Sequence, residues 1–389
     1  MRRAPILVLA LLSWPLSCCC EEPECGDDSR DPGELCYLGE QIGVDPDIET
    51  PLAMRAGRFD ADEHPDLLVL GTDIMSGVGG RLLLGDGDGA LADPSRVAVT
   101  GCSAYPIAGD LDGDERLDLV FATCTRSLLV FRAVGDADFA APIEVPVGVD
   151  ILQTSVADVD GDGRRDLLVL GLNGDGVPAL SFAQTIGDGV FAPAFLTPQG
   201  IDGFAGLVPG MMAAGRIDRD GGFEVVFAEA ERAGALLRTR YVGGAAFAAP
   251  TVIPTKLRPA GLALRDLDGD DDLDLITGDR EHGELVTFLA GGGELVDGPR
   301  TELVGKAWQS FTLGQLDDDG LIDLAVITED HVDLFRGVGD GSFVSGATLG
   351  FPAKVAELTL VDLNDDGRDD LVAGTFTGES ALTIALSGP

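Results

Sequence analysis

The residues best suited to chemistry are four aspartates in the segment DLDGDERLDLVF, residues 110–121. They are Asp110, Asp112, Asp114 and Asp118, at positions 1, 3, 5 and 9 of a short loop. Carboxylates this close repel one another unless a cation lies between them, and Ca²⁺ accepts roughly six to eight oxygen ligands at flexible geometry. The backbone carbonyl of Arg116, at position 7, can add an oxygen while its side chain points away. The spacing therefore predicts a calcium site, and the apolar run that follows it predicts a buried strand.

The same loop pattern recurs along the whole chain. Its seven first positions are Arg58, Asp110, Asp158, Arg216, Asp266, Gln315 and Asp362, at spacings of 52, 48, 58, 50, 49 and 47 residues. Within each period an apolar segment precedes the loop, two more follow it, and a Gly-Asp-Gly turn leads to a short fourth extended segment. A period of about fifty is typical of a propeller or solenoid. We therefore expect residues 51–389 to be all-β, a seven-bladed β-propeller of four-stranded antiparallel blades with calcium-binding loops.

These repeats resemble the FG-GAP/VCBS family, whose propeller also forms the head of integrin α chains. The signatures are GVFAPA at 189–194 and GDGSF at 339–343. The resemblance implies that calcium loops lie on one face of the propeller and that partners engage the other. That opposite face includes a set of residues that form either a binding surface or ordinary exposed loops: Asp202, Phe204, Arg280, Glu281, His282, Trp308 and Gln309.

Four loops carry a complete set of predicted ligands. Their side chains are Asp110, Asp112, Asp114 and Asp118; Asp158, Asp160, Asp162 and Asp166; Asp266, Asp268, Asp270 and Asp274; and Asp362, Asn364, Asp366 and Asp370. The carbonyls at position 7 belong to Arg116, Arg164, Asp272 and Arg368. A borderline sixth loop has Gln315, Asp317, Asp319 and Asp323, with an amide oxygen at position 1. We expect about four to five Ca²⁺ ions as cofactors; the alternative is a set of acidic turns that hold no ion.

Two loops begin with an arginine, which can replace the metal by pairing with acids of its own loop. Arg58 would pair with Asp60, Asp62 and Asp66, and Arg216 with Asp218, Asp220 and Glu224. We expect both loops to be free of metal. None of the complete loops is an EF-hand, because position 12 is not the bidentate glutamate which that motif needs.

The first 18 residues have the order of a signal peptide. Arg2 and Arg3 precede an apolar run at 6–16, which is too short to span a membrane, and cysteines follow at 18–20. The Leu-Ser-Cys ending resembles a bacterial lipobox, which implies lipidation of Cys18, with Cys19 as the alternative and ordinary secretion as the other outcome. We expect a secreted or cell-envelope protein of a bacterium, including an outer-membrane lipoprotein, whose membrane contact is through that anchor alone.

Residues 19–50 form a cysteine-containing segment. Its stretch ECGDDSRDPGELCY resembles the opening of a short motif common in myxobacterial secreted proteins, and this predicts a Cys25–Cys36 disulfide. The last repeat lacks its fourth strand, and residues 35–44 have the right place in the repeat to supply it. We expect this stretch to close the ring with the seventh blade, which would remove an exposed sheet edge. The alternative is a loose tether.

A second cysteine pair flanks the loop of residues 110–118. Cys102 and Cys124 stand eleven residues before and after Gly113. They should therefore face each other at the far end of the hairpin, either as a disulfide or as two free buried thiols.

Composition limits the function. The chain has 67 acidic and 26 basic residues and a net charge of −41, which excludes nucleic acid as a general partner. The histidines His64, His282 and His331 lie in different repeats, and we assign no catalytic residue. We expect a monomeric, non-catalytic, calcium-binding propeller that binds an unknown protein or glycan at the cell envelope. The alternative is a propeller enzyme that acts on polysaccharide in a lyase-like manner, although 6% aromatic residues argue against a sugar-stacking platform.

Overall fold

The computed structural model describes residues 35–388 except 36, 45, 47, 49, 74–76, 93–94, 98–105, 136–137, 188, 198–208, 219–220, 230–234, 245, 280, 304–307, 329–330 and 377–380. Among the described residues the regular elements are β-strands, and none is a helix long and apolar enough to cross a membrane. Several predictions fall outside this part of the chain: the signal peptide, Cys18, Cys25, Cys36, Cys102, Asp202, Phe204 and Arg280. The two disulfides and the lipidation site therefore stay predictions.

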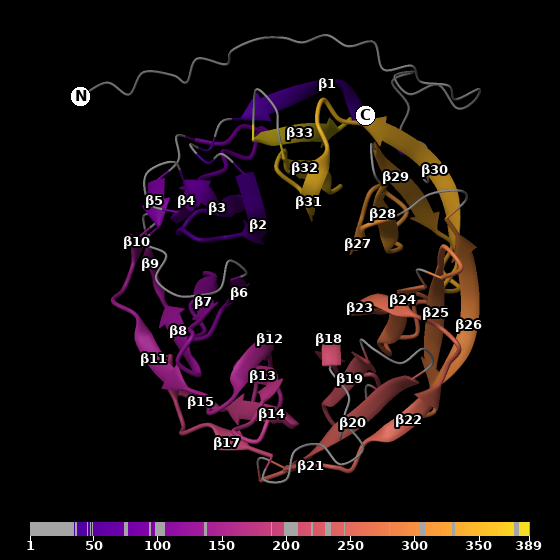
Figure 1. Cartoon of the computed structure of the whole chain (residues 1–389). Coiled ribbons are helices and arrows are strands. Elements are labelled where there is room, and N and C mark those ends of the chain that lie inside the picture. Colours follow the sequence, from indigo (N-terminus) through magenta and orange to yellow (C-terminus); the bar gives the residue numbers. More distant parts are fainter. Residues whose placement is uncertain are drawn as a thin grey trace.

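Seven antiparallel sheets stand around a common axis, with the first strand of each sheet innermost (Figure 1). The first three blades are β2 (Thr50–Gly57), β3 (Asp66–Asp73), β4 (Gly77–Leu83), β5 (Ser95–Val97); β6 (Ile107–Gly109), β7 (Asp118–Ala122), β8 (Ser127–Phe131), β11 (Ile143–Pro146); and β12 (Asp150–Ala157), β13 (Asp166–Leu172), β14 (Pro178–Ala183), β17 (Phe195–Leu196). The next three are β18 (Pro209–Gly215), β19 (Glu224–Glu229), β20 (Ala235–Gly243), β22 (Thr251–Pro254); β23 (Pro259–Arg265), β24 (Asp274–Asp279), β25 (Glu284–Gly291), β26 (Glu294–Glu302); and β27 (Ser310–Gly314), β28 (Asp323–Ile327), β29 (His331–Gly337), β30 (Phe343–Gly350).

The seventh blade combines the two ends of the described chain. It consists of β31 (Val355–Val361), β32 (Asp370–Thr375), β33 (Leu382–Ser387) and β1 (Tyr37–Val44). The outer strand β1 runs antiparallel to β33, with Ile42 opposite Ile384 and Val44 opposite Leu382. The seventh blade thus takes its fourth strand from residues far away in the sequence. With it, the predicted all-β, seven-bladed architecture is confirmed.

Short extra strands lie at the glycine-containing turns between the third and fourth strands of three blades. They are β9 (Ala133–Gly135) with β10 (Asp138–Phe139), β15 (Thr185–Gly187) with β16 (Val190–Phe191), and β21 (Ala246–Phe247), which pairs with β20.

The core lies between neighbouring blades. The second strands carry continuous apolar runs and are buried on both sides, as in β13 and β32, because each blade is packed between two others. Blade one meets blade seven in the same way as other neighbours, with Met54 and Leu67 packed against Val372 and Leu382. Hydrophobic packing therefore continues around the whole ring.

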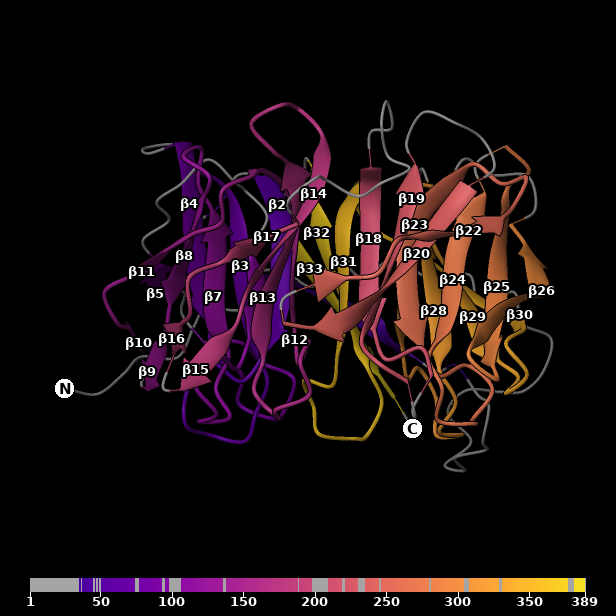
Figure 2. The same ribbon diagram turned by 90° about the horizontal axis from the view of Figure 1, so that it is seen from below.

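The loops that join the first and second strands gather on one face of the disc (Figure 2). We call this the loop face, and number its loops one to seven: residues 58–66, 110–118, 158–166, 216–224, 266–274, 315–323 and 362–370. The described turns between second and third strands, such as residues 123–126 and 173–177, lie on the opposite face.

Candidate metal centres

In six of the seven loops, an aspartate at position 9 fixes the loop to its blade by two backbone hydrogen bonds. Asp118 is fully buried; its Oδ2 accepts the N–H of Leu111 at 3.0 Å and its Oδ1 accepts the N–H of Ala133 at 2.9 Å. One bond fixes the start of the loop and the other fixes the end of the third strand. The same two bonds are made by Asp66, Asp166, Asp274, Asp323 and Asp370. We call these six residues the position-9 aspartates.

Burial raises the pKa of each position-9 aspartate to about 6. The two backbone N–H donors lower the pKa and nearby loop carboxylates raise it, but desolvation is the largest cause. A cation in the loop would favour the ionised form and reverse this shift. The arrangement thus leaves carboxylates whose charge is only partly compensated by the protein.

Side-chain oxygens at positions 1, 3 and 9 converge in three of the four complete loops, the second, third and fifth. The oxygens of Asp110, Asp112 and Asp118 lie within 4.8 Å of one another. The third and fifth loops repeat this cluster with Asp158, Asp160 and Asp166, and with Asp266, Asp268 and Asp274. Several aspartate clusters can therefore hold a metal ion, and oxygen-only ligands suit a hard cation such as Ca²⁺.

Position 3 supplies the sharpest test of whether these residues fit a cation. One buried carboxylate oxygen has no hydrogen-bond partner in each of Asp112 (Oδ1), Asp268 (Oδ1) and Asp317 (Oδ2). A buried, unpartnered carboxylate oxygen is costly, and desolvation raises the pKa of all three residues. A divalent cation would satisfy these oxygens, so the residues fit a metal in the second, fifth and sixth loops.

Positions 1 and 6 shape the turn. Asp110 Oδ1 accepts the N–H of Gly113 at 2.6 Å and Oδ2 accepts that of Glu115 at 3.0 Å. Position 6 has a left-handed backbone, with φ of 68° at Glu115, 70° at Asp271 and 86° at Gly163. In the complete loops, Glu115 and Asp271 are the non-glycine residues at position 6, and their backbone is therefore strained.

The arginines at position 7 differ from expectation. The side chain of Arg116 does not point away from the loop but donates to Asp114 Oδ2, and Arg164 donates to Asp162 Oδ2. The reason is electrostatic, because a guanidinium two residues from a cluster of carboxylates lies within reach of it. A cation bound to Asp114 has to share that carboxylate with Arg116.

The arginines at position 1 reach neighbouring loops. Arg58 Nη2 lies 3.5 Å from Glu115 Oε2, and Arg216 Nη2 lies 3.8 Å from Asp158 Oδ2. These contacts differ from the predicted pairing within each arginine's own loop. The first loop, expected to be metal-free, still brings oxygens of Asp60, Asp62 and Asp66 within 4.8 Å of one another.

In the fourth loop, the residue at position 9 forms an ion pair in place of the two backbone hydrogen bonds that the position-9 aspartates make. Glu224 stands at position 9, where the expected partner was Arg216. Its Oε2 instead accepts from Arg238 Nη2 at 2.6 Å, and its Oε1 lies 3.5 Å from Arg240 Nε. The side chains of Glu224 and Arg238 are 4% and 8% exposed, so this pair is buried.

Successive loops are tied together across the blades. Arg368 at position 7 of the seventh loop donates from Nε to Asp318 of the sixth at 2.8 Å. His64 at position 7 of the first loop lies with Nδ1 2.8 Å from Asp365 of the seventh. The N–H of Leu117 also bonds to the carbonyl of Arg58 at 2.7 Å. Neighbouring loops on this face are therefore mechanically linked.

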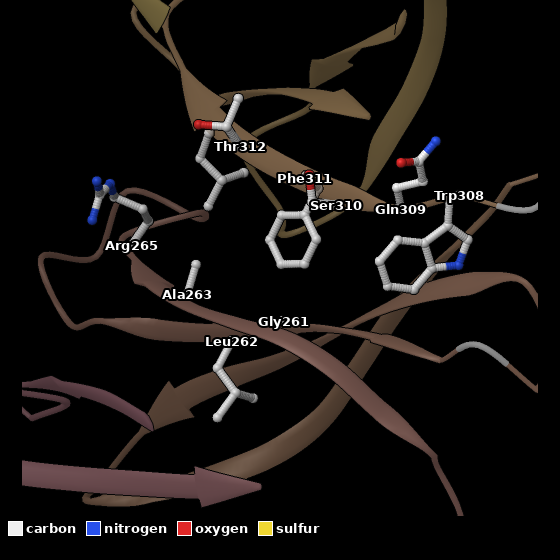
Figure 3. A pocket seen from close by; sticks show the side chains of 10 residues that line it. Gly261, Leu262, Ala263, Arg265, Trp308, Gln309, Ser310, Phe311 and Thr312 are labelled. Atoms are coloured by element: carbon white, nitrogen blue, oxygen red, sulfur yellow. The ribbon is translucent and has the colours of Figure 1, made fainter. Parts of the chain in front are cut away.

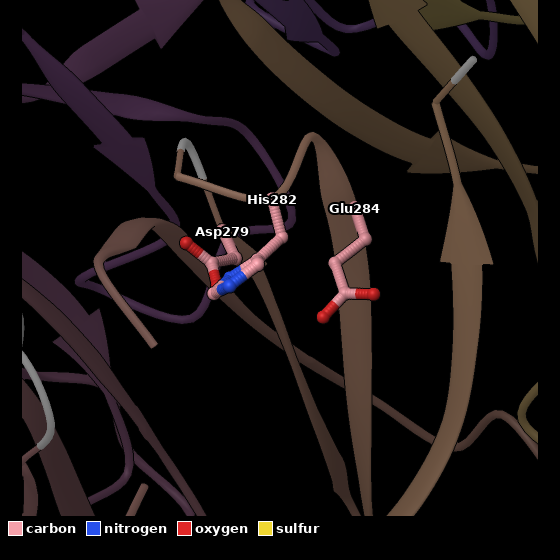
Figure 4. A group of neighbouring side chains, drawn as sticks. All are labelled: Asp279, His282 and Glu284. Carbon is pink, nitrogen blue, oxygen red and sulfur yellow. The ribbon is translucent and has the colours of Figure 1, made fainter. Parts of the chain in front are cut away.

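The opposite face holds a group of which the sequence pointed only to His282. Asp279, His282 and Glu284 bring ligand atoms within 4.8 Å of one another (Figure 4). Asp279 is fully buried, and its Oδ2 lies 2.5 Å from His282 Nδ1, while its Oδ1 accepts the N–H of Glu281 at 2.9 Å. The side-chain hydrogen bond to Asp279 raises the pKa of His282. The spacing of these residues at a β24–β25 turn was the available signal.

Two predicted opposite-face residues have structural roles. Trp308 is only 6% exposed and packs with Phe311 at a ring-centroid distance of 6.4 Å, so the expectation of an exposed tryptophan is wrong. Gln309 donates from Nε2 to the carbonyl of Thr328 at 3.0 Å. Both residues line a pocket between β23 and β27 (Figure 3). Trp308 can be buried here because Gly278 has no side chain: the indole ring occupies the space where a Cβ of residue 278 would lie.

Comparison with known proteins identifies the repeats. The FG-GAP-like repeat family matches residues 58–121, 110–169 and 315–373. These segments include complete loops two, three and seven, the first loop, and the borderline sixth loop. No curated protein matches the sequence.

Solved structures share the fold at low identity. A crystal structure of BBS1N in complex with ARL6DN matches with a TM-score of 0.62, 12% identity, and coverage of 91% of this chain and 98% of that chain. A putative 6-phosphogluconolactonase from Bacteroides uniformis matches with a TM-score of 0.56 and 15% identity, and the match covers 81% of this chain and 90% of that chain. A virginiamycin B lyase from Staphylococcus aureus matches with a TM-score of 0.55 and 11% identity, and the match covers 90% of this chain and 98% of that chain. At these identities the likeness supports the fold alone.

Proposed function

Because this chain is an FG-GAP repeat β-propeller protein, we propose that it is a calcium-stabilised, non-catalytic binding scaffold of the bacterial cell envelope. Ions bound on the loop face hold the blades in register, and the opposite face binds a protein or glycan. The scaffold is a monomer that reaches the envelope through its signal peptide, with Cys18 as its lipid anchor.

One observation carries the calcium part of the proposal: the unpartnered buried oxygens of Asp112, Asp268 and Asp317. An acidic turn in contact with water does not need a buried, unpartnered carboxylate oxygen. A hard cation would bind that oxygen together with the other oxygen ligands of the same loop. The ligands would come from positions 1, 3, 5 and 9 and from the carbonyl at position 7. When bound, the ion would supply charge neutralisation and cross-linking, with no chemical step.

Calorimetry and thermal melting test the calcium part. We expect about four to five bound Ca²⁺ ions per chain, and a melting temperature that falls when EGTA removes them, because the loops become clusters of repelling carboxylates. Mg²⁺ at equal concentration is the control, since its smaller octahedral shell fits this flexible oxygen set poorly. An identical melting curve with calcium and with excess EGTA would contradict the proposal.

A glycan array and a pull-down with the calcium-loaded protein test the binding part. Charge-altering substitutions on the opposite face, such as Glu281→Lys, should reduce capture, whereas Glu115→Lys on the loop face should not. Capture that depends only on loop-face residues would place the partner on the loop face and contradict this part of the proposal.

The enzyme alternative is favoured by one observation, the pair Asp279–His282. A buried carboxylate that holds the Nδ1 of an exposed histidine is the arrangement of a general base, with Nε2 left to take a proton. Lyase-like cleavage of an acidic polysaccharide needs such a base. The test is turnover of a uronic-acid polysaccharide, followed as new ultraviolet absorbance, by the wild-type protein and by His282→Ala. Activity that His282→Ala abolishes would replace the non-catalytic proposal.

A further inference from the structure

The seventh loop contacts both strands that meet at the junction of the ring. In register, Tyr37 of β1 stands opposite Ser387 of β33. Tyr37 Oη donates to the carbonyl of Asp369 at 3.2 Å. The Ser387 hydroxyl lies 2.9 Å from Asp366 Oδ2 and 2.9 Å from Asp370 Oδ1. One pair of opposed residues is therefore hydrogen-bonded to three residues of the same loop.

Further bonds fix the end of β33 to predicted ligands of this loop. Asp370 Oδ1 accepts the N–H of Ser387 at 2.6 Å, and Asn364 Nδ2 donates to the carbonyl of Ser387 at 3.3 Å. Arg368 Nη1 donates to the carbonyl of Gly388 at 2.8 Å. The side chain of Arg368 is 2% exposed, and its Nε and Nη2 bond to Asp318 of the sixth loop.

This hydroxyl contact distinguishes the seventh blade from other blades. The residue at the place of Ser387 is Ala133, Ala290 or Gly337 in the second, fifth and sixth blades, and it offers only its N–H. Thr185 in the third blade has a hydroxyl, but that hydroxyl donates to the carbonyl of Arg165. In the seventh blade, a side chain thus stands between carboxylates at positions 5 and 9.

We propose that the seventh loop is a cation-dependent latch of the ring, in which Ser387 and Tyr37 are positioning residues that couple ion binding to the seating of β1 on β33. The inference rests on the proposed function. A cation that fixes Asp366 and Asp370 also fixes the acceptors of Ser387, and so the end of β33. The Tyr37–Asp369 bond carries the same ordering to β1. In other blades the fourth strand follows the third along the chain, so its attachment depends less on its loop.

Amide hydrogen exchange of the full chain, with ion stoichiometry measured in parallel, tests the latch. In the wild-type protein Ca²⁺ should slow exchange in residues 37–44 by about tenfold or more relative to EGTA. Asp366→Asn should lose one ion and most of that protection. Asp162→Asn, at the same position of the third loop, should lose one ion and keep the protection. Equal loss in both variants, or full protection in Asp366→Asn, would overturn the latch.

Tyr37→Phe keeps every predicted ligand and provides a second test if Asp366→Asn does not fold. It should bind as many ions as the wild type yet show faster exchange in residues 37–44 with calcium present. Unchanged exchange would contradict the coupling. If the wild-type protein binds no Ca²⁺, calorimetry shows this directly and the proposed function fails; if ions bind without slowing β1, only the latch fails.

Discussion

Replacing Asp112 by asparagine should change the stability of the protein in opposite directions with and without calcium. Asp112 lies in the second loop with one buried oxygen unpartnered. Oxygens of Asp110, Asp112 and Asp118 lie within 4.8 Å of one another. An asparagine keeps the size of the side chain and removes its charge. The substitution therefore separates electrostatic repulsion from packing.

The magnitude follows from Coulomb's law. At 4.8 Å, two unit charges repel by about 0.9 kcal/mol in a water-like dielectric and by about 3.5 kcal/mol at an effective dielectric of about 20. Asp112 takes part in two of the three pairs of this cluster, which gives roughly 2–7 kcal/mol if all groups are ionised. Partial protonation of Asp118, whose pKa is about 6, and loss of the 3.3 Å contact with Arg132 both reduce this value. We expect Asp112→Asn to stabilise the calcium-free protein by about 1–2 kcal/mol.

With calcium the sign reverses. A cation present at about 100 times its dissociation constant stabilises the folded state by about 2.7 kcal/mol per site, and Asp112→Asn weakens one site. The assay is thermal unfolding in EGTA and in excess Ca²⁺, with Asp175→Asn as a control of equal charge change in an exposed turn. Opposite shifts for Asp112→Asn and none for the control are expected. A loss of stability in both conditions would refute the electrostatic reasoning.

Three further predictions concern the position-9 aspartates, the turn and the fourth blade. The pKa of the position-9 aspartates is raised to about 6, so the folded calcium-free protein binds more protons than the unfolded chain between about pH 4 and pH 6. Its melting temperature in EGTA should therefore rise as the pH falls from 7 to 5, whereas that of the calcium-loaded protein should fall, because protons compete with the ion; parallel pH series measure both. Glu115→Gly should stabilise the protein by about 0.5–1 kcal/mol and Gly163→Ala should destabilise it by about 1 kcal/mol, because both positions have a left-handed backbone; equal effects of the two changes in chemical denaturation would contradict this. Arg238→Met should cost about 3–5 kcal/mol by leaving the buried Glu224 without its nearest cation, and adding Glu224→Met should recover much of that loss in the same denaturation assay.

The sequence determined the architecture because its information is local and repeated. Each period carries its own loop, its own apolar strands and its own turn, so seven registers predict seven blades without knowledge of long-range contacts. The aspartate spacing also predicted the convergence of positions 1, 3 and 9 in the second, third and fifth loops. Position 5 was predicted to join them, but Asp114 and Asp162 bond to the arginines at position 7 of their own loops.

The direction in which charged side chains point was decided by the tertiary structure. Arg116 folds onto its own loop, whereas Arg58 reaches the neighbouring loop. Sequence spacing determines the position of such a residue in its loop, but the positions of the surrounding carboxylates determine which of them its side chain contacts. The role of the position-9 aspartates was hidden for the same reason, because their second bond goes to a third strand that is 14 to 19 residues away.

The seventh blade shows the division most clearly. The sequence by itself determined that the last repeat has three strands and that its loop carries Asp362, Asn364, Asp366 and Asp370. Only the tertiary structure decided that Tyr37 and Ser387 meet beside that loop. Closing a ring brings together residues hundreds of positions apart, and no local pattern of residues encodes the contacts they then make.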